Sequence, residues 1–167
     1  MSLWNFEGGK IICACGDACV IRKRGREVIN SVQRNSESIG IVGSDRLDEC
    51  GSQLKREVIE PIVNERAQIL RFALIALQSD RVKSKLSYGE PLKLLTSYPN
   101  TAKDLLGGLA GQVVYVSGGI EAELIDRSNE DLDGAIELVQ SGASVRANNL
   151  TIVEDYLRQV NLIKVWS

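Results

Sequence analysis

The sequence has no histidine, few aromatic residues and no long hydrophobic run. Histidine is absent from all 167 residues, which excludes Ser-His-Asp triads, Cys-His dyads and zinc sites with imidazole ligands. No segment approaches the roughly 20 consecutive apolar residues of a transmembrane helix, and the first residues lack the basic and apolar regions of a signal peptide. We therefore expect a cytoplasmic protein that does not bind membranes.

The chain also lacks an excess of charge of either sign. It has 20 Lys and Arg against 22 Asp and Glu, a net charge of −2, and 5% aromatic residues. A nucleic-acid-binding protein needs a basic face and often aromatic side chains on which bases stack, so we expect no nucleic-acid partner. The content of 44% hydrophobic and 25% charged residues is typical of a globular protein.

The four cysteines, Cys13, Cys15, Cys19 and Cys50, are candidates for a metal or redox site. Their spacing differs from the paired Cys-x2–4-Cys pattern of zinc sites. Residues 11–15 instead resemble a buried strand, in which Cys13 and Cys15 share one face as small hydrophobic side chains. We interpret the cysteines as structural, with a metal or redox site as the alternative.

Short apolar runs alternate with amphipathic stretches, which is typical of an α/β protein with largely parallel strand pairing. The strands are predicted at residues 10–15, 19–21, 38–42, 68–77, 93–96, 113–117, 135–139 and 162–166. The helices are predicted at residues 26–33, 45–49, from about 99 onward, at 120–125 and after 141. The polar residues 78–91 are predicted to form a hinge.

The segment that indicates chemistry most clearly begins with two acids, Asp133 and Glu137. If residues 133–139 form a strand, alternation places both side chains on one face. Carboxylates on a buried strand are costly unless they are paired or bind a ligand. The alternative is that both are solvated residues of a turn.

Four small residues follow these acids: Ser141, Gly142, Ala143 and Ser144. Glycine allows a positive φ, and the backbone N–H groups at the start of a helix favour an anion, to which the two hydroxyls add donors. Acids beside such a loop fit a phosphorylated sugar. The alternative is an ordinary helix N-cap after a strand.

Residues 133–148 closely resemble the phosphoribosyl-pyrophosphate loop of the ATP phosphoribosyltransferases, the enzymes that open histidine biosynthesis. Three further segments resemble motifs of that family and occur in the same order. They are IGIVGSD at residues 39–45, LLTSYPN at 94–100 and SGGIE at 117–121.

The resemblance implies a fold, an α/β architecture of the two-lobed, periplasmic-binding-protein-like type II class. Each lobe is expected to be a mixed, mostly parallel sheet flanked by helices. Residues 1–78 and 151–167 would form the first lobe and residues 79–150 the second, with the active site in the cleft between them.

The resemblance also implies an activity, the glycosyltransferase reaction of an ATP phosphoribosyltransferase. The phosphoribosyl group of phosphoribosyl pyrophosphate is transferred to N1 of ATP, giving phosphoribosyl-ATP and pyrophosphate. By resemblance, the loop Ser141–Ser144 would hold the 5-phosphate. Asp133 and Glu137 would be catalytic residues beside the ribose hydroxyls and possible ligands of magnesium. Other residues implied to line the cleft are Arg22, Asp45, Thr96, Ser97 and Glu121.

The N-terminal part of the sequence departs from the family pattern. The family usually begins with an A-[LI]-P-K-G-R-L turn, and nothing before Cys13 resembles it. The basic residues at positions 22–26 either compensate for this turn or form an ordinary solvated basic turn. Glu137 stands where the family usually has Asp, and Gly134 stands where it has alanine.

These departures leave two functions open. One is a catalytic chain that forms a homo-oligomer or works with a regulatory subunit. The other is a non-catalytic or partner-dependent relative that only binds a phosphorylated ligand.

Overall fold

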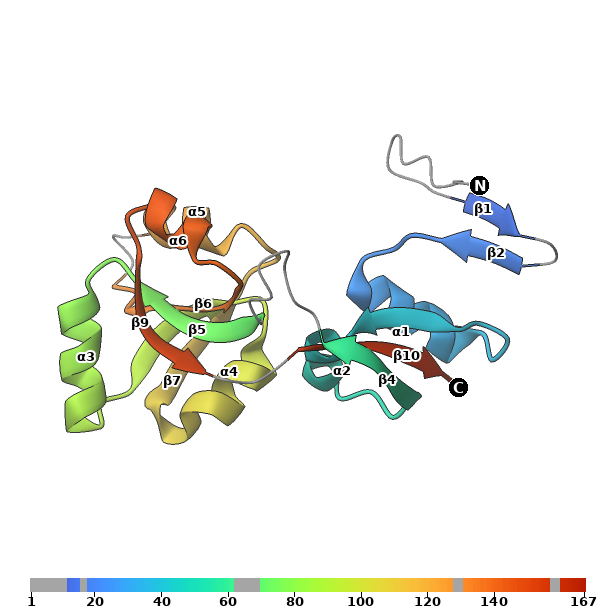
Figure 1. Ribbon diagram of the computed structural model, residues 1–167. Helices are drawn as coiled ribbons and strands as arrows, with labels where there is room; N and C mark the ends of the chain where they lie inside the picture. The colour runs from blue at the N-terminus through green and yellow to red at the C-terminus, as the bar shows by residue number, and fades with distance from the viewer. Residues whose placement is uncertain (1–11, 16–17, 62–69, 128–130, 157–159) are drawn as a thin grey trace.

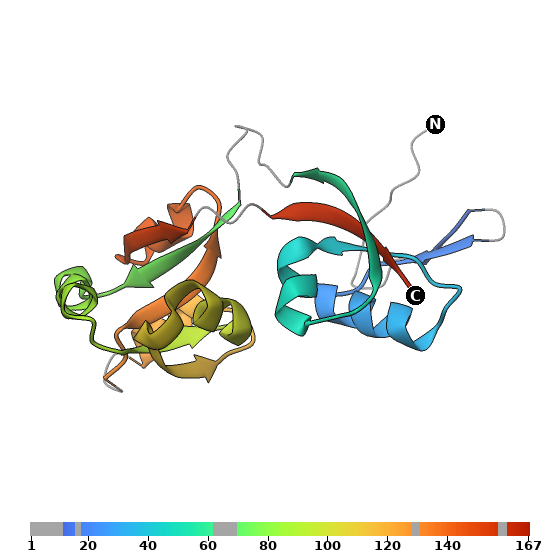
Figure 2. The ribbon, with the colours of Figure 1, turned by 90° about the horizontal axis from the view of Figure 1, so that it is seen from below.

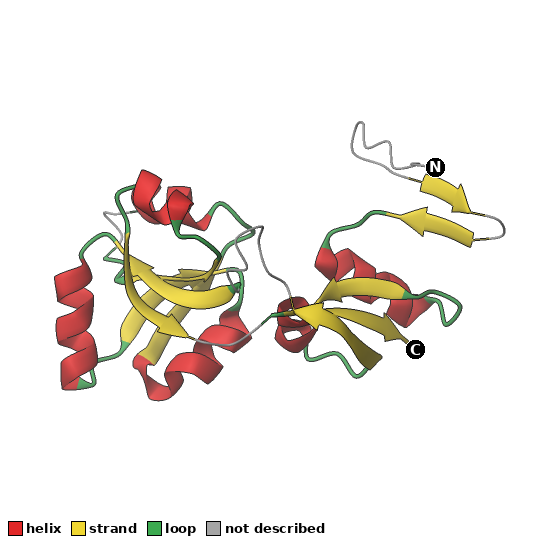
Figure 3. Ribbon diagram, viewed as in Figure 1, coloured by secondary structure: helices red, strands yellow, loops and turns green. Residues whose placement is uncertain are grey.

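Two separate sheets divide the computed structural model into two lobes, which lie side by side (Figures 1 and 3). The structure describes residues 12–15, 18–61, 70–127, 131–156 and 160–167. Within these ranges, no helix has both the length and the apolar character needed to cross a membrane.

The first lobe is a three-stranded antiparallel sheet with helices packed on one face (Figure 2). Its core joins Ile29, Val32 and Leu47 from the helices to Ile163 and Val165 from the central strand. The strands in spatial order are β3 (Gly40–Gly43), β10 (Asn161–Trp166) and β4 (Lys55–Pro61), and the helices are α1 (Gly25–Arg34) and α2 (Ser44–Cys50).

A separate antiparallel hairpin precedes α1 and extends away from the first lobe (Figure 1). It consists of β1 (Ile12–Cys15) and β2 (Ala18–Ile21), which confirms the two predicted strands. The predicted start of the first strand at residue 10, and the turn between the strands, lie outside the described residues. So do the side chains of Cys13, Cys15 and Cys19, whereas Cys50 is a free, partly buried thiol.

The second lobe is a five-stranded sheet with helices on both faces. In spatial order its strands are β7 (Ala110–Tyr115), β6 (Leu92–Thr96), β8 (Gly134–Val139), β5 (Arg71–Ala76) and β9 (Thr151–Tyr156). Its helices are α3 (Ser79–Tyr88), α4 (Pro99–Leu106), the 3-10 turn η1 (Gly107–Leu109), α5 (Ile120–Asp126) and α6 (Ala143–Ala147).

Alternation along each strand supplies two hydrophobic cores, one on each face of this sheet. Leu74 faces the core under α3 and α4, together with Ala102. Its neighbour Ile75 faces the core under α5 and α6, together with Leu124 and Val145. Because helices pack on both faces of the sheet, the position of strand β8 is fixed relative to the helices around it.

The sheet to which β5 and β9 belong differs from the sequence prediction. Residues 1–78 and 151–167 were expected to form the first lobe, but β5 and β9 pair in the second-lobe sheet. The reason is visible in β5, whose residues 72–76 are all buried. A strand that is apolar on both faces needs a central place in a sheet covered on both sides.

The predicted hinge at residues 78–91 is wrong, because most of it forms α3. Val82 is fully buried against the sheet, and Leu86, one turn later, packs on the same core. The helix ends at Gly89, whose φ of 68° closes it. One buried and one partly buried apolar residue, four positions apart, were enough to hold this helix on the sheet.

Strand direction also differs from expectation. The ladders β6–β7 and β6–β8 are parallel, whereas β5 pairs antiparallel with both β8 and β9. The α/β class is confirmed, while largely parallel pairing holds only for one part of the second sheet. Strands β4 and β9 were not predicted because each has several charged residues and lies at a sheet edge with an exposed side.

Candidate active site

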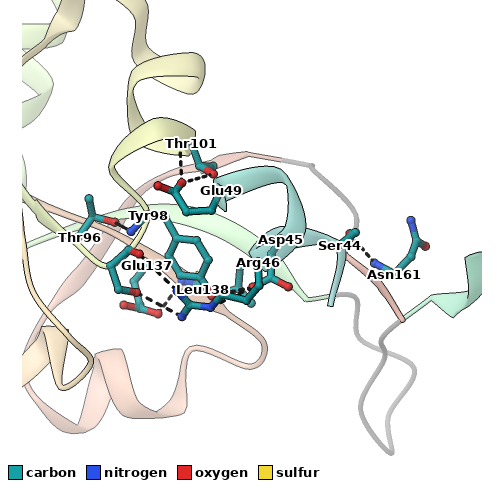
Figure 4. Close-up of polar contacts among 11 residues, drawn as sticks. Ser44, Asp45, Arg46, Glu49, Thr96, Tyr98, Thr101, Glu137, Leu138 and Asn161 are labelled. Carbon is teal, nitrogen blue, oxygen red and sulfur yellow. Dashed lines mark hydrogen bonds and ion pairs between the residues drawn. The ribbon is translucent and has the colours of Figure 1, made fainter. Parts of the chain in front are cut away.

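The two lobes meet where α2 contacts the residues that follow β6 (Figure 4). The Tyr98 hydroxyl donates a 2.7 Å hydrogen bond to Oδ2 of Asp45. The Arg46 guanidinium lies 3.9 Å from the centre of the Tyr98 ring and donates to the carbonyl and hydroxyl oxygens of Ser97 at 3.3 and 3.4 Å. Asp45, Ser97 and Tyr98 are all buried. The contact therefore combines enclosed hydrogen bonds with a cation–π interaction.

Glu49 of the first lobe caps α4 of the second. Its carboxylate accepts hydrogen bonds from the backbone N–H groups of Asn100 and Thr101 at 2.9 and 2.8 Å, and from the Thr101 hydroxyl at 2.9 Å. The Asn100 side chain donates back to the Glu49 carbonyl at 2.9 Å. A carboxylate at a helix N-terminus satisfies unpaired N–H groups and is favoured by the helix dipole. This cap ties the orientation of α4 to α2.

Replacing Glu49 with glutamine is expected to lower the free energy of unfolding by about 1–2 kcal/mol, because charge-assisted hydrogen bonds to α4 become neutral ones. Denaturant unfolding would measure the loss, and small-angle scattering would show a larger radius of gyration if the lobes separate. Glu123→Gln is the control, since among the described residues the one ion-pair partner of Glu123 is Arg127, on the surface of α5. Equal effects of the two changes would contradict a role between the lobes.

Among the predicted cleft residues, Thr96 is fully buried and its hydroxyl is committed to the protein. It donates to the Ile136 carbonyl at 2.7 Å and accepts from the Tyr98 N–H at 2.9 Å. Thr96 therefore shapes the end of β6 rather than contacting a ligand. Asp45 and Ser97 also lie in the contact between the lobes, where Asp45 is occupied by Tyr98 and Ser97 borders a cavity.

Glu137 lies near the carboxyl end of β8, close to this contact. The pKa of its carboxyl is raised to about 7, chiefly by burial and in smaller part by the charge of Glu121. The Leu138 N–H, which donates to Glu137 at 2.9 Å, and the charge of Arg46 act in the opposite direction. A partly buried acid held close to neutrality, among charges from both lobes, is typical of a functional site.

The loop from Ser141 to Ser144 has the predicted glycine with a positive φ, followed by the start of a helix. Gly142 has φ 69° and is the N-cap of α6, and the Ser141 hydroxyl accepts from the Ala143 N–H at 3.3 Å. The Ser144 hydroxyl donates to Glu121 at 2.8 Å. Glu121 lies near enough to Glu137 that its charge raises the pKa of the Glu137 carboxyl, so the structure brings the loop and both glutamates together.

Asp133 does not join this group. It precedes β8 at the opposite end from the loop, and four residues of strand separate its Cα from that of Glu137 by about 13 Å. Its carboxylate is almost fully enclosed by Lys85 at 2.8 Å, Arg81 at 3.4 Å and the Lys93 N–H at 2.8 Å. Asp133 thus connects α3 to β6 and β8. The prediction that it faces the same ligand as Glu137 disagrees with this geometry.

The positions of these acids do not match the implied magnesium site. Asp133 and Glu137 are too far apart to share an ion, and the described part of the chain holds no group of three Asp, Glu, Cys or His side chains able to bind a metal. The paired acids do not fit a protein-held magnesium site. Glu137 with its neighbour Glu121 could contact only an ion that is carried mainly by substrate phosphates.

A cavity of about 890 Å³ opens between the lobes beside the α2–α4 contact. The first lobe contributes Arg24, Arg26 and Arg46 to its wall, and the second lobe contributes Tyr115 and Ser117. Arg22, which was predicted to line the cleft, is exposed just after β2 and is not part of this wall.

Comparison with known proteins assigns the family. A family model described as ATP phosphoribosyltransferase matches residues 24–164. The chain belongs to the ATP phosphoribosyltransferase family. It is 30% identical over 135 residues to an ATP phosphoribosyltransferase of Clostridium botulinum (strain Okra / Type B1), covering 79% of this chain and 58% of the relative. It is 31% identical over 133 residues to one of Deinococcus deserti, covering 78% and 55%. The chain thus spans less than three fifths of the length of these family members.

A solved structure of this family has a similar fold. The ATP phosphoribosyl transferase (HisG:HisZ) complex from Thermotoga maritima matches with a TM-score of 0.65 and 17% identity, covering 96% of this chain and 74% of that chain. This match confirms the expected two-lobed, periplasmic-binding-protein-like fold.

Two residues that matter in the contact between the lobes were missed from the sequence. Arg46 directly follows Asp45, the last residue of a segment that resembles a family motif, so its place near the contact could have been predicted. Glu49 gave no signal, because a surface acid on a short helix becomes a cap only when another helix meets it.

Proposed function

We propose that this chain is a phosphoribosyltransferase of the cytoplasm, which transfers phosphoribosyl from phosphoribosyl pyrophosphate to N1 of ATP. The observation that carries the proposal is the Ser141–Ser144 loop at the start of α6, with Glu121 and Glu137 beside it. Membership of the ATP phosphoribosyltransferase family supports it. The loop suits a phosphate and the acids suit sugar hydroxyls, so together they suit a phosphorylated ribose.

In the proposed reaction, adenine N1 attacks the anomeric carbon as the bond to pyrophosphate breaks. Backbone N–H groups and hydroxyls of the loop hold the 5-phosphate, which fixes the sugar. Glu137 accepts hydrogen bonds from ribose hydroxyls and lies near the positive charge that develops on the ring. Because ATP is the nucleophile, no side chain needs to attack the sugar, and the lack of histidine is no obstacle.

Magnesium would enter with its substrate. An ion carried on the diphosphate of phosphoribosyl pyrophosphate would supply charge neutralisation for the pyrophosphate, and Glu137 is the described carboxylate of the predicted pair that could contact it. Asp133, which is enclosed by Lys85 and Arg81, has no part in this proposal.

We also propose that the chain works in a complex, either as a homo-oligomer or with a regulatory subunit. The Thermotoga maritima protein with the similar fold was solved as a complex of two different proteins.

Isothermal titration with phosphoribosyl pyrophosphate and magnesium, with and without ATP, tests the proposed function. We expect micromolar binding that ATP modifies, followed by detection of phosphoribosyl-ATP in an activity assay. Binding that is indifferent to ATP, without product, would instead indicate a relative that only binds a phosphorylated ligand. Absence of binding would contradict the proposal.

The double change Ser141→Ala and Ser144→Ala is expected to weaken phosphoribosyl pyrophosphate binding about 10-fold or more, because two donors to the phosphate are lost. The thermal midpoint should change little, since both residues are exposed. Ser87→Ala is the control, as this hydroxyl lies on α3 and donates to the Lys83 carbonyl, one turn earlier in the same helix. Gly142 is unsuitable for this test, because its φ of 69° makes any side chain there strained. Unchanged affinity in the double variant would exclude the loop.

A further inference from the structure

The side chain of Arg46 extends from α2 of the first lobe to the second lobe, where it contacts two consecutive residues (Figure 4). Its guanidinium donates to the carbonyl and hydroxyl oxygens of Ser97 at 3.3 and 3.4 Å and lies over the Tyr98 ring. Both residues belong to the turn between β6 and α4. Because one acceptor is a carbonyl oxygen, Arg46 holds the backbone of this turn as well as its side chains.

Hydrogen bonds connect the same turn to strand β8. The Tyr98 N–H donates to the Thr96 hydroxyl at 2.9 Å, and that hydroxyl donates to the Ile136 carbonyl at 2.7 Å. Thr96 is fully buried, so water does not compete for these bonds. Ile136 directly precedes Glu137 in β8. A continuous series of protein contacts therefore leads from Arg46 to the backbone that carries Glu137.

The Tyr98 ring is held in place for its contact with Arg46. Its hydroxyl donates to Asp45 at 2.7 Å, and the ring packs edge-on against Phe72, with centroids 5.0 Å apart and planes at 82°. Burial, and then the charge of Asp45, raises the pKa of Tyr98, so the hydroxyl keeps the proton that it donates. A buried ring fixed in this way presents one face to the guanidinium, and a cation–π contact is strongest when it is desolvated.

The charge of Arg46 also reaches the sugar site. Burial raises the pKa of the Glu137 carboxyl, and the positive charge of Arg46 acts against this rise. A guanidinium stays charged throughout the physiological pH range. Arg46 therefore favours the ionised carboxylate, which accepts hydrogen bonds from sugar hydroxyls.

We propose that Arg46 is a positioning residue for the sugar site, which joins the first lobe to the turn after β6 and so holds Glu137 in place beside the Ser141–Ser144 loop. The inference rests on the proposed function and adds a residue to it, since the segments that resemble family motifs end at Asp45 and resume at Leu94. Arg46 acts here through Ser97 and Tyr98, without touching the ribose. Contact between the lobes and binding of a phosphorylated ribose are thereby linked.

A double-mutant cycle tests this link, because it measures coupling between two residues directly. Isothermal titration with phosphoribosyl pyrophosphate and magnesium would compare wild type, Arg46→Met, Glu137→Ala and the double variant. We expect Arg46→Met to weaken binding about 10-fold in the presence of Glu137, because the turn loses both hydrogen bonds and the cation. In the Glu137→Ala background the same change should weaken binding by no more than about twofold, because the positioned carboxylate is already absent.

Two further variants separate positioning from a general loss of charge. Arg56→Met removes a guanidinium from the same lobe, where Arg56 pairs with Asp48 of α2, and should leave the affinity unchanged. Arg46→Lys retains the charge and one donor for Ser97, and should bind within about threefold of wild type. If Arg46→Met does not fold, Arg46→Gln takes its place in the cycle, since it retains a donor to the turn.

Three results would overturn the role of Arg46 and leave the proposed function standing. These are an unchanged affinity in Arg46→Met, even if its thermal midpoint falls, an equal loss in Arg56→Met, and a loss of the same size with and without Glu137. If wild type does not bind phosphoribosyl pyrophosphate, the proposed function itself fails, and this inference fails with it.

Discussion

Replacing Asp133 with alanine is expected to lower the free energy of unfolding by about 2–3 kcal/mol, because the Lys93 N–H and the partly exposed Lys85 and Arg81 lose the buried acid that they share. The Asp133 side chain is 1% exposed and contacts Lys85, Arg81 and the Lys93 N–H. Affinity for phosphoribosyl pyrophosphate should stay unchanged below the unfolding transition. Denaturant unfolding and isothermal titration measure the two effects.

Asp131→Asn provides the matched control. Asp131 forms an ion pair with the same Arg81, but its side chain is 79% exposed, so its removal should hardly change the unfolding midpoint. If Asp133→Ala does not fold, Asp133→Asn retains the shape and an acceptor for the Lys93 N–H and should give a smaller loss. A stable Asp133 variant that has lost affinity for phosphoribosyl pyrophosphate would contradict this structural role and would indicate that Asp133 binds the ligand.

The stability of wild type is expected to fall relative to Glu137→Gln as pH rises from about 4.5 to above 7. Burial raises the pKa of the folded Glu137 carboxyl from 4.5 to about 7. Between these values the folded protein holds a proton that the unfolded chain has lost. The stabilisation is therefore fully present below the unfolded pKa and is lost through the folded one, by about 3 kcal/mol in total.

Unfolding free energies of both proteins at pH 4.5 and pH 8 would measure this difference, since all other titrating groups are common to the pair. Glu121→Gln should reduce the pH dependence, because the Glu121 charge helps to raise the pKa of Glu137. Glu123→Gln, on the exposed side of α5, should leave it unchanged. Parallel pH profiles for wild type and Glu137→Gln would contradict a buried, raised acid.

Binding of a phosphorylated ribose would use the ionised form of Glu137, which accepts hydrogen bonds from hydroxyls. At pH 6.5 binding should therefore release a proton, and the measured enthalpy should depend on the ionisation enthalpy of the buffer. The Glu137→Gln variant should lack this dependence.

The parts of the fold that were predicted correctly depend on short-range signals. The apolar run of β5, the stop of α2 at Gly51 and the start of α4 at Pro99 each need only a few neighbouring residues. The Ser141–Ser144 loop is of the same kind, because a glycine with positive φ before a helix sets its shape locally. Helix α3 was missed because its segment is mostly polar, and its two apolar contacts with the core, Val82 and Leu86, are visible only once the sheet has formed.

The effect of Gly134 on strand β8 differs between the sequence and the structure. This residue stands where the family usually has alanine, and a glycine inside a strand generally weakens the strand because it has no side chain to pack. In the structure a Cβ at this position would overlap the Ile75 carbonyl oxygen of the paired strand. Only glycine allows β8 to start this close to β5, so the residue permits tight packing.

By itself, the sequence determined the family, the α/β class and the phosphate loop, because these depend on residue order and local backbone conformation. Only the tertiary structure decided which acids share a site. Alternation along the strand places Asp133 and Glu137 on one face. The two residues lie at opposite ends of β8, however, and each end contacts different elements. Asp133 meets the cations of α3, whereas Glu137 meets Glu121 and the first lobe. The contact of α2 with α4 and the arginine-lined cavity likewise exist only because segments 50 or more residues apart in the chain pack together.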